Sequence, residues 1–417
     1  MDNREVVFTK DMKKDYTILI PTMLPMHFKF LAQIFTTYGY NAELLENVGR
    51  NVVDCGLKYV HNDTCYPALL VIGQFIDALE SGKYDTRKVA LMLTQTGGGC
   101  RASNYIALLR KALEKAGYGY VPVISLNFSG LDTAPGFEIT LPMLKRMVYA
   151  VFYGDLLMLL RNQCRPYEVK LGETDALCTK WTDRLVGEMK TRGIKYSQVK
   201  KNYKLIVEDF NKIERTSEKR VKVGIVGEIF VKFSPLGNND LENFLVSEGA
   251  EVSMPGLVDF CLYCVYNGIV DRELYGTSAV RAAVMKFAYD FVVKKQGDLI
   301  AAVKENSSFT PPTPIEHTKS LIDGYIGFGT KMGEGWLLPA EMLELIDSGV
   351  KNIVCAQPFG CLPNHIVGKG MMKPIKEKHP DVNIVAIDYD PGATKINQEN
   401  RIKLMLSCAA ENLKKNG

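Results

Sequence analysis

The chain has 417 residues, of which 47% are hydrophobic and 24% charged, as in ordinary folded proteins, so a disordered chain is excluded. Lysine and arginine number 51 against 47 acidic residues, and this net charge of +4 is too small to indicate nucleic-acid or polybasic membrane binding. No apolar run approaches the ~18 residues of a transmembrane helix. The polar start of the chain does not resemble a secretory signal, so we expect a cytoplasmic protein.

Short apolar runs alternate with helical patterns in the first part of the chain. The runs typical of strands lie at residues 16–20, 42–45, 89–93 and 121–126. Helical periodicity lies between them, at residues 28–38, 66–79 and 103–116. Strands separated by helices of roughly 10–15 residues predict βαβ units and a parallel sheet.

A helical middle separates this pattern from a second one. Residues 180–218 carry many charges, which favours a solvated amphipathic bridge over a basic docking face. Strand patterns then return at residues 222–226, 251–253, 352–356 and 383–387. We therefore predict an α/β protein with two doubly wound parallel-sheet lobes. The expected divisions are a first lobe at 1–155, a helical bridging region at 156–220 and a second lobe at 221–417.

Cysteine is unusually frequent in this chain. The ten cysteines lie at positions 55, 65, 100, 164, 178, 261, 264, 355, 361 and 408. A reducing cytosol disfavours disulfides, so metal binding or redox chemistry is favoured as a role for these cysteines. Open α/β sheets bind ligands beyond the carboxyl ends of their strands. Cysteines in the segments that follow the predicted strands are therefore the candidate ligands.

Cys100 ends the segment TQTGGGC, directly after the strand predicted at 89–93. Gly98 and Gly99 permit a left-handed backbone with amide groups pointing at an anion, and a thiolate there has a lowered pKa. A simple tight turn is the structural alternative. No lysine follows at P-loop spacing, so we exclude a nucleotide-binding P-loop.

Two further segments bring cysteine to the same edge. Cys361 lies in the loop CAQPFGCLPNH, whose prolines and glycine stop regular structure, and is favoured as a ligand. Cys355 lies at the end of the strand before it and is equally compatible with a core position or a ligand. Cys65 follows capping residues near a predicted helix start, where the helix dipole favours its thiolate.

The other cysteines are interpreted as structural. Cys261 and Cys264 form a CxxC pair, but the surrounding VDFCLYCVYN is apolar and predicts a buried element. Cys164, Cys178 and Cys408 lie in helical stretches. Three or four thiolates are thus expected between the lobes, and soft thiolates select zinc or iron–sulfur clusters.

Four segments carry a family resemblance that covers nearly the whole chain: HNDTCYPALLVIGQFIDAL, TQTGGGCRASNYIALLRKAL, QPFGCLPNHIVGKGM and IDYDPGATKINQENRIKL. They resemble the carboxy-terminal region of acyl-CoA dehydratase activase-related proteins. More remotely, this region is similar to the subunits of 2-hydroxyacyl-CoA dehydratases and to double-cubane cluster proteins. The resemblance implies two flavodoxin-like lobes with an oxygen-sensitive iron–sulfur cluster in the cleft.

The resemblance also implies ligands and partners. Cys65, Cys100 and Cys361 would hold a [4Fe–4S] cluster with one iron open to substrate, whereas Cys355 as a fourth ligand would close it. The implied partner is an ATP-dependent activase, separate or fused, that donates one low-potential electron. An acyl-CoA substrate and a dimer are implied as well, although no residue identifies a CoA pocket.

Within that family, the implied reaction is a radical dehydration or reduction. Gly98, Gly99, Arg101 and Asn104 are candidates for cofactor contacts beside Cys100. His365, four residues after Cys361, is a candidate donor to a leaving hydroxide. Glu228, just after the strand predicted at 222–226, is a candidate acid or base.

Three other functions stay open at this stage. A double-cubane [8Fe–9S] reductase of small molecules needs six thiolates, a number that ten cysteines permit. A fully ligated cluster would suit a non-catalytic electron-transfer or scaffold module. A structural zinc protein is the fourth alternative.

Overall fold

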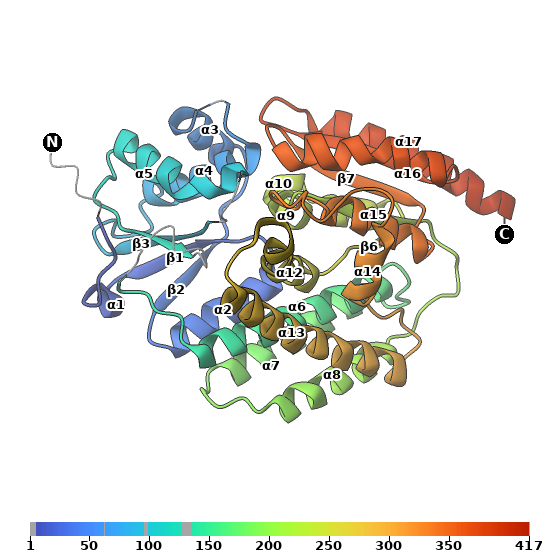
Figure 1. Ribbon diagram of the computed structural model, residues 1–417, viewed down its shortest axis with the longest axis horizontal. Coiled ribbons are helices and arrows are strands. Elements are labelled where there is room, and N and C mark those ends of the chain that lie inside the picture. Colours follow the sequence, from blue (N-terminus) through green and yellow to red (C-terminus); the bar gives the residue numbers. More distant parts are fainter. Residues whose placement is uncertain (1–5, 62, 96–98, 127–134, 417) are drawn as a thin grey trace.

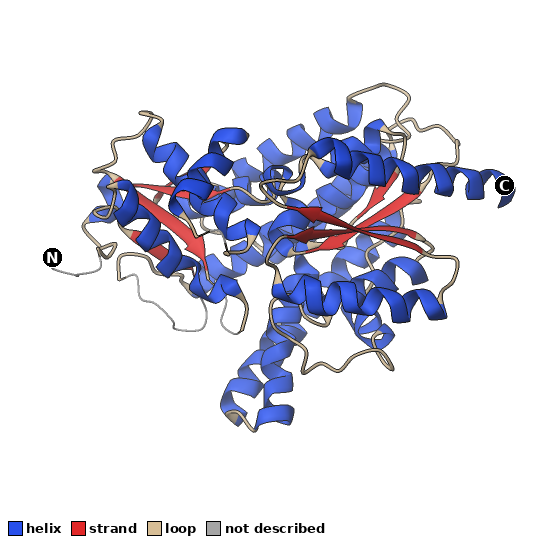
Figure 2. Cartoon of the chain, turned by 90° about the horizontal axis from the view of Figure 1, so that it is seen from above, coloured by secondary structure: helices blue, strands red, loops and turns tan. Residues whose placement is uncertain are grey.

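The computed structural model describes residues 6–61, 63–95, 99–126 and 135–416. These residues form an α/β protein with two four-stranded, all-parallel sheets surrounded by helices (Figures 1 and 2). The predicted α/β class and parallel sheets are therefore confirmed.

The first sheet has the order β2-β1-β3-β4. Its strands are β1 (Thr17–Pro21), β2 (Asn41–Leu45), β3 (Val89–Thr94) and β4 (Val123–Leu126). Every strand coincides with a predicted apolar run, because helices cover both faces and the strands contain few polar residues. The order reverses on the two sides of β1, and such a reversal opens a crevice at the carboxyl edge.

The second sheet repeats this arrangement with the order β6-β5-β7-β8. Its strands are β5 (Lys222–Gly227), β6 (Glu251–Ser253), β7 (Asn352–Pro358) and β8 (Asn383–Tyr389). The pairing of β5 with β7 sets Val226 beside Cys355 and Gly227 beside Ala356. The loops after β5 and β7 therefore leave the sheet side by side.

The helices of the first lobe are α1 (Met12–Asp15), α2 (Pro25–Thr37), α3 (Arg50–Tyr59), α4 (Tyr66–Glu80), η1 (Arg101–Asn104) and α5 (Tyr105–Ala116). Helix α4 is buried on nearly all sides, which matches its apolar sequence. It packs so closely on α3 that a Cβ atom at Gly73 would lie 2.1 Å from the carbonyl oxygen of Val52. Only glycine permits that approach.

A helical layer joins the two lobes. It comprises α6 (Leu141–Cys164), α7 (Glu173–Met189), α8 (Tyr196–Asn211), α12 (Leu257–Tyr275) and α13 (Ala279–Asn306). Helix α6 is continuous through the expected boundary at 155–156. Trp181, Tyr203 and Phe210 are fully buried in this layer, so the charged segment that contains them also carries an apolar face.

The helices of the second lobe are α9 (Ile229–Phe233), α10 (Pro235–Asn238), α11 (Leu241–Ser247), α14 (Ile315–Leu321), α15 (Leu337–Asp347), the π-helical turn η2 (Asn364–Gly368), α16 (Lys369–Lys378) and α17 (Lys395–Asn416). One cluster of buried side chains includes residues of both lobes, among them Leu69 and Val231. Among the described residues, no helix is long and apolar enough to cross a membrane.

Candidate cysteine site between the lobes

Cys65 begins helix α4 and lies directly beside the loop that carries Cys361. The amide of Tyr66 donates to the carbonyl oxygen of Phe359 at 2.9 Å, a hydrogen bond between the two lobes. Gly360 has a φ of +70°, and a Cβ there would lie 3.2 Å from the Cα of Cys65. The glycine before Cys361 thus lets the two cysteine-bearing segments touch.

Both of these thiols are buried and hydrogen-bonded. The Sγ of Cys65 lies 3.1 Å from the hydroxyl oxygen of Tyr105. The side-chain amide of Asn364 donates to the Sγ of Cys361 at 3.3 Å. A tyrosine hydroxyl or an asparagine amide can stabilise a thiolate by donating to it.

Cys100 is half-buried and precedes the short helix η1. Next to it, the amide of Gly99 lies 2.9 Å from the Sδ of Met332. Gly333 packs against the ring of Pro363, two residues after Cys361. The segment at 332–334 therefore connects the Cys100 loop to the Cys361 loop.

Two buried carboxylates accompany the cysteines. Glu228 caps α9 and accepts from the amide of Val231 at 2.8 Å, and Glu334 accepts from the amide of Ile229 at 2.9 Å. Burial, followed by the charge of Glu334, raises the pKa of Glu228 to about 8. Burial also raises the pKa of Glu334. Like charges that share one buried site disfavour joint ionisation, so at neutral pH the pair retains a proton.

The carboxylates and the three thiols influence one another. Burial raises the pKa of Cys65 to about 11. Hydrogen bonds of Tyr105 and of the Ala68 amide oppose this rise, and the charges of Glu228 and Cys100 add to it. Burial also raises the pKa of Cys100 and of Cys361, and both Glu228 and Glu334 add to that rise. Glu228 therefore acts electrostatically on all three thiols, and Glu334 acts on those of Cys100 and Cys361.

The lowered thiol pKa expected at Cys65 and Cys100 is wrong. The amides of Arg101 and Ala102 do favour the thiolate of Cys100, as a helix start should. Burial outweighs these hydrogen bonds at both cysteines, because the free energy needed to remove a thiolate from water exceeds the stabilisation that a few amide groups provide.

The remaining sequence-predicted residues lie in the core, on the surface, beside Cys100 or outside the described chain. Cys355 is fully buried in a core cluster of the second lobe, and its Sγ lies 3.8 Å from the Oδ1 of Asn364. His365 is exposed and its ring contacts the side-chain amide of Gln357. Arg101 is exposed in η1, and Asn104 ends that helix. Gly98 lies outside the described residues.

The CxxC pair was expected to be buried, and the structure corrects this. Cys261 and Cys264 lie one turn apart on α12 with exposed side chains. The surrounding protein nevertheless desolvates both thiols and raises their pKa, that of Cys261 to about 12. The charge of Glu334 adds to the rise in the pKa of Cys264.

A second buried charge pair, formed by Lys232 and Glu341, acts electrostatically on the acid pair. The ammonium of Lys232 lies 2.9 Å from the Oε1 of Glu341, and both side chains are almost fully buried. Lys232 lowers the pKa of Glu228, Glu334 and Glu341, against the larger effect of burial. A single ammonium thus only partly offsets the effect of burial on these three carboxyl groups.

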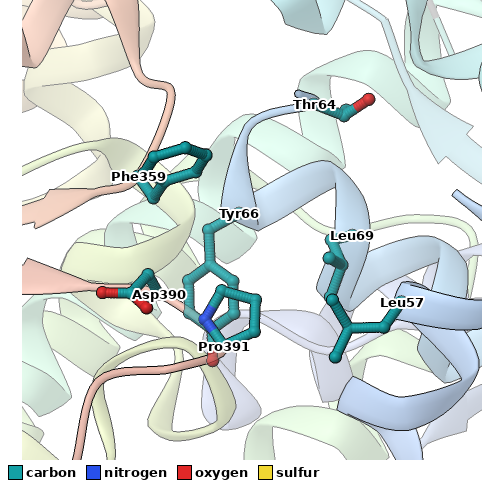
Figure 3. Close-up of a pocket in the computed structure, with 7 residues that line it drawn as sticks. All are labelled: Leu57, Thr64, Tyr66, Leu69, Phe359, Asp390 and Pro391. Atoms are coloured by element: carbon teal, nitrogen blue, oxygen red, sulfur yellow. The ribbon is translucent and has the colours of Figure 1, made fainter. Parts of the chain in front are cut away.

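A small cavity lies beside the junction of Cys65 and Phe359. It measures about 200 Å³ and is lined by Leu57, Thr64, Tyr66, Leu69, Phe359, Asp390 and Pro391. Figure 3 shows these residues around the ring of Tyr66, with the Asp390 oxygens directed away from Leu57 and Leu69. The cavity wall is therefore mainly apolar.

In the part of the chain that the structure describes, no group of three or more His, Cys, Asp or Glu side chains is arranged to hold one metal ion. The fold and the site thus define an α/β protein whose lobes bring three cysteines next to a buried acid pair. No protein-family model matches this chain, and no curated protein sequence matches it.

Proposed function

We propose that this protein binds an iron–sulfur cluster of the 2-hydroxyacyl-CoA dehydratase type between two flavodoxin-like lobes. It would accept a low-potential electron from an ATP-dependent activase for the radical dehydration or reduction of a substrate. The observation that supports the proposal is the contact between the Cys65 segment and the Cys361 loop, to which Met332 and Gly333 join the Cys100 loop. Thiols from three separate loops are a soft donor set, as iron–sulfur clusters require.

Cys65, Cys100 and Cys361 would be the ligands, and each must lose its proton when the cluster binds. A bound cluster supplies the electron transfer and a Lewis-acidic iron. Tyr105 and Asn364 hold the Sγ atoms of Cys65 and Cys361 in place through hydrogen bonds. Hydrogen bonds to the sulfurs also adjust the reduction potential of such clusters.

Glu228 is the acid that fits this chemistry. Its raised pKa keeps a proton on its carboxyl at neutral pH, and Glu334 shares that proton. A buried acid of this kind can donate to a leaving hydroxide, which is poorly expelled without a proton. We assign this role to Glu228 rather than to the exposed His365.

A second candidate, the double-cubane reductase of small molecules, is favoured by the CxxC pair. Cys261 and Cys264 have exposed side chains one turn apart on α12, and Glu334 acts on the thiols of both Cys264 and Cys100. Together with the three proposed ligands they would supply five thiols, close to the six that a double-cubane cluster needs. The two candidates differ in whether Cys261 and Cys264 bind iron.

The test is electron paramagnetic resonance of anaerobically prepared protein, reduced chemically, with and without an acyl-CoA. A cluster signal that shifts when the thioester is added supports dehydratase-type function. A signal that ignores the thioester but responds to a small reducible molecule supports the double-cubane candidate. A cluster that can be reduced but responds neither to the thioester nor to the small molecule would indicate electron transfer alone.

A further inference from the structure

A buried lysine without an acceptor lies in the helical layer. Lys295 of α13 is only 8% exposed, although a lysine side chain is rarely buried without a partner. In the part of the chain that the structure describes, its ammonium has neither an ion-pair partner nor a hydrogen-bond acceptor. An ammonium carries three donors, and their burial without an acceptor costs free energy. An anion beside Lys295 would remove that cost.

Aromatic rings hold this ammonium in place. The Nζ of Lys295 lies 3.2 Å from the centre of the Tyr196 ring on α8 and 5.1 Å from that of Phe291 on α13. A ring face attracts the cation, but it does not provide oxygens for its three N–H groups. The ring of Tyr149 on α6 lies 5.4 Å from that of Tyr196, between centroids. Helices α6, α8 and α13, which pack on one another (Figure 1), thus contribute rings to one aromatic group beside the ammonium.

Three further lysines on these helices act electrostatically on Lys295. Burial lowers the pKa of Lys295, the charge of Asp298 opposes this change, and the charges of Lys294, Lys145 and Lys200 add to it. The side chains of these three lysines are exposed. An anion that arrives from solvent therefore meets their ammonium groups as well.

Asp298 is the carboxylate that acts on Lys295, and its two oxygens already have other partners. Its Oδ2 accepts from the hydroxyl of Tyr196 at 2.7 Å, and its Oδ1 lies 3.0 Å from the Nζ of Lys200. The other two lysines have no ion-pair partner among the described residues. Four ammonium groups thus share one carboxylate, and this excess of positive charge favours an anionic ligand.

We propose that the lysine cluster, made of Lys145, Lys200, Lys294 and Lys295, is a binding site for the phosphate group of a small ligand. A phosphate dianion brings several strong acceptor oxygens and two negative charges, and lysine binds phosphate as a point charge. The rings of Tyr149 and Tyr196 can contact an organic part of such a ligand. The inference does not depend on the proposed function, because no residue of the candidate cysteine site belongs to the cluster.

The test is isothermal titration calorimetry of the full chain with inorganic phosphate and with phenyl phosphate, at low ionic strength in a chloride buffer. We expect saturable binding of one phosphate group per chain and a dissociation constant at least roughly tenfold larger in Lys295→Met. Methionine keeps the apolar stem and removes the charge. Lys304→Met is the matched control, because Lys304 is exposed on the same helix and is not part of the cluster. Circular dichroism verifies that both variants fold.

Lys294→Met gives a second measurement that leaves the buried side chain in place. We expect it to weaken phosphate binding at least roughly threefold, since one of the four positive charges is lost. Tighter binding of phenyl phosphate than of inorganic phosphate would indicate a phosphorylated organic ligand, and equal affinities would indicate free phosphate. A wild type that binds neither probe would overturn the proposal. Equal losses in Lys295→Met and Lys304→Met would also overturn it, because diffuse surface charge would then explain the binding.

Discussion

Glu228 is a buried acid whose ionisation couples the stability of the fold to pH. Its carboxyl ordinarily titrates near 4.5, and burial beside Glu334 raises its pKa to about 8. Between these pH values the folded protein holds a proton that the unfolded chain has released. Rising pH therefore favours unfolding over this interval, and the loss of stability persists above it.

Glu228→Gln should flatten this pH dependence. Glutamine keeps a side-chain oxygen for the amide of Val231 but does not titrate. We expect the free energy of unfolding to fall less between about pH 5 and pH 8 in the variant than in the wild type. Urea unfolding across that range checks this. Glu377→Gln, on the surface of α16, should keep the wild-type slope, and an unchanged slope in Glu228→Gln would contradict the assignment.

Some features of single residues could be predicted from the sequence, and others could not. The loops of Cys65, Cys100 and Cys361 could be predicted, because each follows an apolar strand or precedes a capped helix. Glu334 was missed, since its loop follows no strand; the only signal was its position between Gly333 and Gly335, both with positive φ. The burial that raises the thiol pKa values depends on the packing of both lobes, which local sequence does not reveal.

At the scale of elements, Asp155 on α6 joins the helix α12 to the helical layer and to α2. Its two oxygens accept from the amides of Leu257 and Val258 at the start of α12, at 2.9 and 2.8 Å. The Nε2 of His27 lies 2.8 Å from the same carboxylate. Asp155 thereby fixes the helix that carries Cys261 and Cys264.

Asp155→Ala should destabilise the protein by about 2–4 kcal/mol, because it leaves two amides and a buried histidine without their acceptor. Denaturant unfolding measures this loss. Asp183→Ala on α7, where no ion pair is present among the described residues, is the matched control. A loss below about 0.5 kcal/mol at Asp155 would show that α12 is held in place by its apolar contacts alone.

A glycine tests the packing of α3 on α4. Gly73→Ala should cost at least roughly 2 kcal/mol, since its Cβ would meet the backbone of Val52 and the two helices would have to separate. Thermal unfolding provides the measurement, with Gly187→Ala, which meets nothing within 4 Å, as the control. Equal melting temperatures for Gly73→Ala and wild type would contradict the close packing.

Elements differ in how well the sequence predicted them. Most strands of the described chain were predictable because they are short apolar runs flanked by polar residues or glycine, whereas β6 has only Val252 as an apolar residue. The exposure of Cys261 and Cys264 was not, because α12 is apolar around most of its circumference. Such a helix gives no indication of which side meets solvent.

At the scale of the whole molecule, the two sheets and the helical layer bring the loops of the candidate site together. The strand order reverses in each sheet, and the loops at those reversals carry Cys100, Glu228 and Cys361. Contacts between the lobes, such as that of Tyr66 with Phe359, then bring the loops together. The sequence predicted both sheets. The division at 155–156 between first lobe and bridge stays a prediction, and α6 runs through that point.

The most direct test of this account is the iron and acid-labile sulfide content per chain after strictly anaerobic preparation, in wild type, Cys100→Ser and Cys408→Ser. We predict about four irons in the wild type, the same content in Cys408→Ser, whose thiol is exposed on α17, and a marked loss in Cys100→Ser. About eight irons, reduced by Cys261→Ser, would instead select the double-cubane candidate. A wild type without iron, or a Cys100→Ser variant with full iron content, would contradict the central claim.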